Sequence, residues 1–128
     1  MKNIIFILYV KDQALSRDFY SKTLGIKPTL DVPGMTEFEL FSGVKLGLMP
    51  EKNIAKIISP PLPDPSSGNG IPRCEVYLYV EIPAEYIARG IAAGGKLVNE
   101  LSPRDWGDNA GYISDLDGNV LAFAKKIS

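Results

Sequence analysis

The side chains that could do chemistry in this chain are carboxylates, tyrosines, lysines, one cysteine and one tryptophan, because none of its 128 residues is histidine. The absence of imidazole excludes Ser-His and Cys-His nucleophilic catalysis and removes the usual general base near neutral pH. Among the remaining candidates, Glu75, Tyr77 and Tyr79 alternate along one segment. Alternate residues of a strand share a face, so this spacing predicts an acid beside two phenols.

Glu75 is the candidate catalytic residue. Among Tyr77, Tyr79 and Ile5, its carboxyl could be desolvated enough to act as an acid or base. It could equally anchor a cationic ligand. Cys74 has the opposite strand parity, so we expect an inert thiol in the core.

Trp106 is the only tryptophan and lies in a polar stretch with Arg104, Asp105, Asp108 and Asn109. Two interpretations stay open for it. The indole either stacks against a planar ligand or closes one end of the structure around it.

Charge and cysteine content narrow the partners and the compartment. Fourteen basic and fifteen acidic residues give a net charge of -1, which offers no attraction for nucleic acid or an anionic membrane. Cys74 cannot form an intrachain disulfide, which fits a reducing compartment. The apolar residues 4–10 are followed directly by Lys11 and Asp12, so we read them as a strand rather than a signal peptide or membrane span. We expect a cytoplasmic protein.

The sequence repeats its pattern near residue 74. Residues 4–10 and 74–80 are predicted strands, and each is followed by a predicted helix, over residues 12–24 and 82–94. Apolar stripes of Ala14, Leu15, Phe19 and Leu24, and of Ala84, Ile87 and Ile91, are expected to pack inward. Further strands are expected at 27–32, 35–41 and 44–49, and at 96–101, 110–115 and 119–124. The second half carries five additional residues, which we place around 102–109.

Each half is thus a βαβββ module. We predict an α+β fold in which two tandem modules form a curved mixed sheet around a cavity, with the helices on the outer face. The predicted single domain, residues 1–128, comprises module 1 (about 1–50), a linker (about 51–72) and module 2 (about 73–128). Proline and glycine in residues 58–72 oppose regular structure there, so that stretch is an irregular connector or a functional lid.

Strand alternation separates a uniformly apolar face, expected under the helices, from a mixed face. The mixed face is expected to line a cavity or a dimer interface. We place Glu37 and Glu39 on the mixed face, since a three-residue turn after residue 41 avoids burying two carboxylates. The predicted ligand-binding residues are Tyr9, Glu37, Glu39, Glu75, Tyr77, Tyr79, Trp106 and Tyr112.

The tandem modules, the opening IIFILYVKDQALSRDFYSKTLGI and the closing WGDNAGYISDLDGNVLAF together resemble the vicinal oxygen chelate superfamily. This superfamily includes glyoxalase I, bleomycin resistance proteins and extradiol dioxygenases. The resemblance implies one metal ligand on each of four strands, at positions that align with Ile5, Gly47, Glu75 and Ala122. Three of these cannot bind a metal, so we expect no metal and no other cofactor. The resemblance that remains is to metal-free members that bind and sequester drugs in a dimer.

Asp115, Asp117 and Asn119 could suggest a calcium loop, but Gly118 does not stand at the EF-hand spacing, and we favour a hairpin turn. Our leading hypothesis is a metal-independent protein that binds or sequesters a small aromatic or cationic molecule, as in antibiotic resistance. A metal-free lyase or isomerase using Glu75 and a tyrosine is the second hypothesis. The third is a dimeric interaction module. The expected partners are a small organic ligand and a second copy of the chain.

Overall fold

A computed structural model describes residues 1–128. In the first module the elements are β1 (Ile4–Val10), α1 (Gln13–Leu24), β2 (Leu30–Val32), β3 (Met35–Phe41) and β4 (Val44–Pro50). In the second module they are β5 (Glu75–Tyr79), α3 (Pro83–Ala92), β6 (Lys96–Pro103), β7 (Asp108–Ser114) and β8 (Val120–Lys126). The segment between them contains α2 (Glu51–Ile58) and the short 3-10 helix η1 (Pro65–Gly68).

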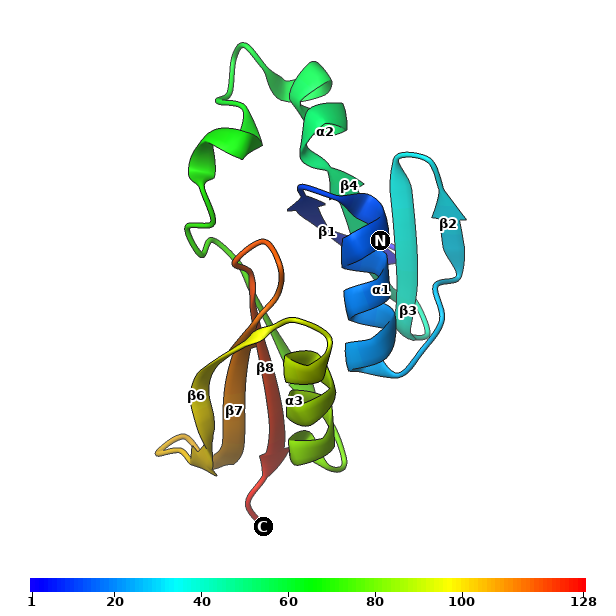
Figure 1. Ribbon diagram of the computed structural model, residues 1–128. Coiled ribbons are helices and arrows are strands. Elements are labelled where there is room, and N and C mark those ends of the chain that lie inside the picture. The colour runs from blue at the N-terminus through cyan, green and yellow to red at the C-terminus, as the bar shows by residue number, and fades with distance from the viewer. The chain divides into compact units, whose positions relative to one another are not determined.

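The two modules share one sheet topology (Figure 1). The strand orders are β1-β4-β3-β2 and β5-β8-β7-β6, and in each sheet the first strand runs parallel to the last while the other pairs are antiparallel. The predicted α+β fold of tandem βαβββ modules is therefore confirmed. Each module has its own open four-stranded sheet, where the sequence had led us to expect one curved sheet.

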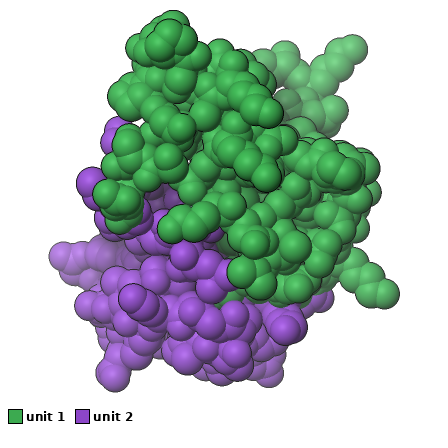
Figure 2. All heavy atoms as spheres, turned by 45° about the horizontal axis from the view of Figure 1, so that its top comes forward, with its two compact units in different colours: residues 1–21, 26–69 green, residues 22–25, 70–128 purple.

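The chain divides into two compact units, residues 1–21 with 26–69 and residues 22–25 with 70–128 (Figure 2). The predicted linker begins with a helix, α2, because residues 51–58 precede the proline-rich stretch and include one buried apolar residue, Ile54. None of the helices is long and apolar enough to cross a bilayer.

Helix α1 begins and ends as its sequence predicts, and Phe19 and Leu24 of the predicted stripe are buried, but Ala14 and Leu15 are not. The Asp12 carboxylate accepts a hydrogen bond from the Leu15 amide at 2.9 Å, and Gly25 ends the helix with φ of 70°. Leu15 is 60% exposed, and Ala14 is exposed as well. The buried side chains of the helix recur at helical spacing: Ser16, Phe19, Tyr20, Thr23 and Leu24. Two polar members made this stripe hard to recognise from hydropathy.

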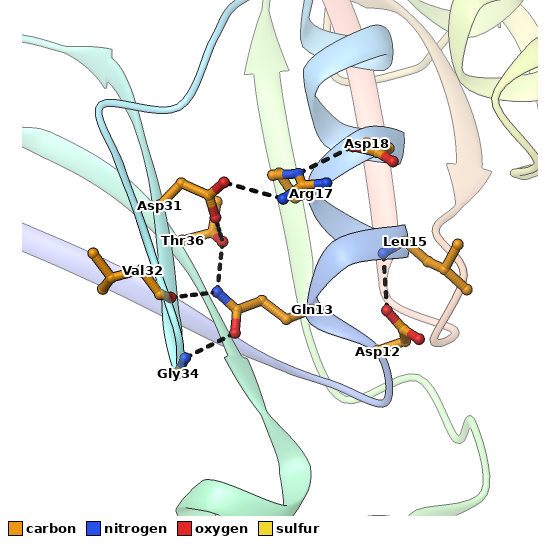
Figure 3. A network of polar contacts seen from close by, with 9 residues as sticks. All are labelled: Asp12, Gln13, Leu15, Arg17, Asp18, Asp31, Val32, Gly34 and Thr36. Atoms are coloured by element: carbon orange, nitrogen blue, oxygen red, sulfur yellow. Dashed lines mark hydrogen bonds and ion pairs between the residues drawn. The ribbon is translucent and has the colours of Figure 1, made fainter.

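A polar network joins the first turns of α1 to the β2–β3 hairpin (Figure 3). The Gln13 amide nitrogen donates to Thr36 Oγ1 at 2.9 Å, and its oxygen accepts from the Gly34 amide at 2.9 Å. The Arg17 guanidinium donates to Asp31 at 3.1 Å, and Thr36 donates to the other oxygen of that carboxylate at 2.9 Å. These bonds give the three-residue edge strand β2 partners beyond its ladder with β3.

Helix α3 packs on the sheet of β6, β7 and β8, drawn from yellow to red in Figure 1. Its buried residues are Pro83, Ile87 and Gly90, whereas Ala84 and Ile91 of the predicted stripe are exposed. Gly90 and Gly111 permit this close approach, because a Cβ at Gly90 would collide with Ile113 and one at Gly111 with Ile87.

The additional residues of the second module are shared between two turns, which corrects the single insertion placed around residues 102–109. Two residues separate the paired Val32 and Met35, whereas five separate Pro103 and Asn109. Likewise two residues separate Phe41 and Val44, and five separate Ser114 and Val120. Both hairpins of the second module therefore have longer turns than their counterparts.

The turn between β7 and β8 is closed by Asp115, which is 5% exposed. Its carboxylate accepts hydrogen bonds from the backbone amides of Asp117 and Asn119 at 2.9 and 2.8 Å, and from the Asn119 side chain at 2.9 Å. The carboxylate thereby serves the turn, so the hairpin interpretation of this segment is confirmed over the calcium loop.

We predict that Gly118→Ala destabilises the protein more than Gly107→Ala. Both glycines have a positive φ, 90° at Gly118 and 96° at Gly107. Alanine therefore costs about 1 kcal/mol or more of stability at either site. Only at Gly118 would the new Cβ also collide with backbone, that of Gly70, while nothing lies within 4 Å at Gly107. The additional loss should reach about 1–3 kcal/mol, measured by denaturant unfolding.

Gly68→Ala is the matched control, since this glycine has neither a positive φ nor an atom within 4 Å of the new Cβ. It should be close to neutral. Equal losses of stability at Gly107 and Gly118 would contradict the predicted collision with the Gly70 backbone.

Candidate functional site

The mixed face of the second sheet carries the predicted alternation. Tyr77 and Tyr79 of β5 lie opposite Ala122 and Ala124 of the parallel strand β8. Both alanines are fully buried, and their small side chains leave space for the two phenol rings. The ring centroids of the tyrosines are 5.4 Å apart at an interplanar angle of 66°. The sequence therefore placed these two side chains correctly on one face.

Asp108 is the centre of this site. The Tyr77 and Tyr79 hydroxyls both donate to Asp108 Oδ2, at 2.7 and 2.8 Å. The Trp106 indole N–H in turn donates to the Tyr77 hydroxyl oxygen at 3.0 Å. Asp108 is 2% exposed, and hydrogen bonds to a buried carboxylate are the strong, charge-assisted kind. The four side chains thus form one connected network.

The network lowers the pKa of its carboxyl group and raises the pKa of its two phenols, so each group keeps the protonation state that the hydrogen bonds require. The hydrogen bond from Tyr77 is the main cause that lowers the pKa of Asp108, with further help from Tyr79 and the charge of Lys126. Burial first, and then the bond to Asp108, raises the pKa of Tyr77 to about 12. The same carboxylate raises the pKa of Tyr79. At neutral pH the site therefore holds one anion and two neutral phenols.

Trp106 lies in the turn between β6 and β7, and Arg104 shapes that turn. The Arg104 guanidinium donates to the Asn99 side chain at 2.9 Å and to the Glu100 and Ala110 carbonyls at 2.8 and 2.9 Å. The Arg104 amide also donates to the Asp108 carbonyl at 2.7 Å. Arg104 is thus occupied in holding the turn.

The indole of Trp106 is 56% exposed even though its N–H is bound. One part of it contributes to the Tyr77 network, and the other faces solvent. The side chain therefore has both a fixed polar anchor and an exposed aromatic surface, and its stacking on a ligand stays a prediction.

Asp108 is the one member of this network that was not among the predicted site residues. It was noted only as a neighbour of Trp106, because the strand was taken to begin at Ala110. Strand β7 begins at Asp108, which pairs with Lys126, and Tyr112 follows at the same parity. The alternation that selected Tyr112 would have selected Asp108 had the strand been extended by two residues.

The remaining predicted residues of the second module lie outside this network. Glu75 is exposed at the start of β5. The sequence had suggested a desolvated carboxyl at this position, and the exposure contradicts that. The Tyr112 ring lies below the Arg104 guanidinium, 5.1 Å from its central carbon. Cys74 is exposed, which corrects the expected core thiol, because it precedes the first paired residue of β5.

The predicted residues of the first module are Tyr9 on β1 and Glu37 and Glu39 on β3. Glu37 pairs with Gly47 and Glu39 with Lys45, so both carboxylates lie on the mixed face as predicted. The turn has two residues, not three, and a bulge after Glu39 restores the register. Glu37 forms an ion pair with Lys45 at 3.3 Å. Tyr9 is 41% exposed on β1.

A hollow of about 280 Å³ adjoins the network, lined by Tyr79, Val80, Glu81, Lys125 and Lys126. The Lys126 ammonium lies 5.0 Å from the centroid of the Tyr79 ring. A larger hollow of about 420 Å³ lies along β6. We favour the smaller one as the site, because the larger is lined by a single strand without an aromatic ring, and its Asn99 is bound to Arg104.

The residues at the four metal-ligand positions of the resemblance do not fit a metal ion. No group of three or more acidic or cysteine side chains is gathered in a way that could hold one. A side chain at Gly47 would meet Ile7 and Met35 at 3.2 Å, so apolar atoms fill that space. Ala122 is fully buried, and Glu75 is the single oxygen donor of the set.

Comparison with known proteins identifies the same family. The model of the Glyoxalase/Bleomycin resistance protein/Dioxygenase superfamily matches residues 4–123. No curated protein matches the chain.

Solved structures of similar fold cover nearly the whole chain. A glyoxalase-related enzyme from Fulvimarina pelagi is 21% identical with a TM-score of 0.81, over 98% of this chain and 89% of that one. A glyoxalase/bleomycin resistance protein/dioxygenase from Nocardioides is 20% identical with a TM-score of 0.76, over 100% and 84%. TioX from Micromonospora sp. ML1 is 20% identical with a TM-score of 0.69, over 98% of each chain. At these identities the likeness shows the fold.

We predict that Asp108→Asn lowers stability at neutral pH and that its difference from the wild type shrinks on acidification. The pKa of Asp108 is below its ordinary 3.8 in the folded state. The stabilisation by the ionised form is therefore complete above 3.8 and is lost as the pH falls through the lower folded value. Unfolding free energies at neutral pH and at about pH 2–3 would measure this.

Asp105→Asn is the control, because it removes the same formal charge from an exposed residue of the same turn. Its effect should stay within about 0.5 kcal/mol. A cost of Asp108→Asn that is constant across this pH range would contradict the linkage.

Proposed function

The chain belongs to the glyoxalase/bleomycin resistance protein/dioxygenase superfamily, and on that premise we propose that it is a metal-independent protein that binds a small organic molecule. The binding site is the mixed face of the second module, around Tyr77, Tyr79, Trp106 and the Asp108 that joins them. Sequestration of a drug or metabolite is the role we propose for this binding.

The observation that carries the proposal is the half-exposed aromatic surface held by a buried carboxylate. Trp106 and Tyr79 are each 56% exposed, although both are fixed by hydrogen bonds. A side chain that is already ordered loses little conformational entropy when a ligand packs on it, so rigid aromatic groups are efficient binding surfaces. The hollow beside Tyr79 is near the small end of the usual range for ligand pockets, which favours a small ligand.

Metal independence is supported by the donor chemistry. The metal enzymes that this chain resembles hold their ion through four strand positions. The residues that align with those positions here are Ile5, Gly47, Glu75 and Ala122. A single carboxylate leaves a divalent ion coordinated mainly by water and weakly bound. We therefore propose binding without metal or other cofactor.

Binding is favoured over lyase or isomerase chemistry. That hypothesis needs a tyrosine as proton donor, but a phenol whose pKa is raised to about 12 is a poor acid near neutral pH. It also needs a desolvated base, and Glu75 is exposed. The phenols are better suited to holding the aromatic surface in place.

We predict that ligands of the site quench tryptophan fluorescence and that EDTA leaves this quenching unchanged. Trp106 is the sole tryptophan, so the emission reports on this site alone. Elemental analysis of the purified protein should find no Zn, Ni, Fe or Mn at one atom per chain.

A stoichiometric, tightly bound metal, or quenching that EDTA abolishes, would overturn metal independence. The control is Tyr86→Phe on α3, which retains a ring stacked on Phe123 at 5.2 Å and leaves the Asp108 network untouched. Its quenching curve should match that of the wild type.

We also propose that the protein is a cytoplasmic homodimer. Strand β1 exposes large apolar side chains: Ile4, Ile5, Phe6, Ile7 and Tyr9 are each at least 40% exposed. A run of this kind is usually covered in solution, and a symmetric dimer is the commonest cover. We expect sedimentation at micromolar concentration to give twice the mass of the 14.0 kDa chain. A monomer at that concentration would refute the dimer and the interaction-module hypothesis together.

A further inference from the structure

The two tyrosines of the network differ in what their oxygens still offer. A phenol hydroxyl has one proton to donate and lone pairs that accept. Both protons are committed to Asp108 Oδ2, at 2.7 Å from Tyr77 and 2.8 Å from Tyr79. Toward a ligand, each hydroxyl can therefore act only as an acceptor. The ionised carboxylate fixes this polarity, since it has no proton of its own to give.

The acceptor position of Tyr77 is already occupied. The Trp106 indole N–H donates to the Tyr77 oxygen at 3.0 Å, which completes a chain from indole to phenol to carboxylate. Trp106 thus serves as an example, within this protein, of the group that the position accepts: a planar aromatic ring with an N–H donor.

Tyr79 lines the hollow of about 280 Å³ together with Lys126. Lys126 is its present neighbour, with its ammonium 5.0 Å from the ring centroid. The charge and hydrogen bonding of Lys126 lower the pKa of Tyr79, against the larger raising effect of Asp108. Lys126 is exposed. Its contact with Tyr79 contributes little free energy in water, and fixing its long side chain costs conformational entropy. A ligand can therefore replace it at small cost.

We propose that the hollow beside Tyr79 binds a planar aromatic ligand that donates an N–H to Tyr79 Oη, displacing Lys126 and repeating the contact of Trp106 with Tyr77. This inference rests on the proposed function and specifies the ligand class of that site. It disfavours aromatic ligands that present only acceptors, because an acceptor would face the oxygen lone pairs with no proton between them.

The test compares indole with benzofuran, which has the same shape but carries a ring oxygen in place of the N–H. Binding is followed by NMR on 15N-labelled protein, through the single Trp106 indole resonance and the backbone amide of Tyr79. We expect indole to bind roughly threefold to tenfold more tightly, as one hydrogen bond contributes. Tyr79→Phe should abolish this preference, and Lys126→Met should preserve or increase it, because Lys126 competes for the same oxygen. Tyr86→Phe is the control and should behave as the wild type.

The outcomes separate this inference from the proposed function. Equal or tighter binding of benzofuran to the wild type, or a preference that survives Tyr79→Phe or disappears in Lys126→Met, would overturn the ligand class while leaving small-molecule binding intact. If neither compound shifts the Trp106 and Tyr79 resonances, the proposed binding site itself fails. Lys126→Met changes an exposed residue, so it keeps the test decisive if Tyr79→Phe disturbs the fold.

Discussion

The parallel pairing of the first and last strands governs each module. Strands β1 and β4, and likewise β5 and β8, run in the same direction, so no hairpin can join them and the chain must cross over. The helix that follows the first strand packs on the sheet through aromatic rings: the ring centroid of Tyr20 on α1 lies 6.4 Å from that of Phe38, and Tyr86 of α3 stacks on Phe123. The opposite face carries polar and aromatic side chains, several of which remain exposed at little cost.

On that face a single carboxylate sets the character of the second module. An ion as little exposed as Asp108 has to be compensated, and here the compensation comes from two phenol protons and a nearby lysine. The same bonds order Tyr79 and, through Tyr77, the exposed indole of Trp106. The hydrogen bonds that compensate the charge of Asp108 are therefore the same bonds that order the exposed aromatic side chains.

Much of this could be predicted from the sequence, because strand and helix periodicities are set by local geometry. Residues 4–10 form the predicted strand without a change of boundary, and Tyr77 and Tyr79 share the predicted face. Failures arose where a boundary or a polar residue interrupted the pattern. Beginning β7 at Ala110 concealed Asp108, and buried Ser16 and Thr23 concealed the inner face of α1. The hydrogen bonds at Asp108 join residues about 30 positions apart, beyond the reach of any local pattern.

The unequal turns of the two modules have a further consequence. The longer turn of the second module supplies Trp106, while its counterpart in the first module consists only of Pro33 and Gly34. The two modules thus share one strand order, while a longer turn in the second module presents an exposed indole. The shorter turn is itself anchored to α1, because Gln13 binds the Val32 carbonyl and the Gly34 amide, so lengthening it would cost the first module a link that the second module's turn does without.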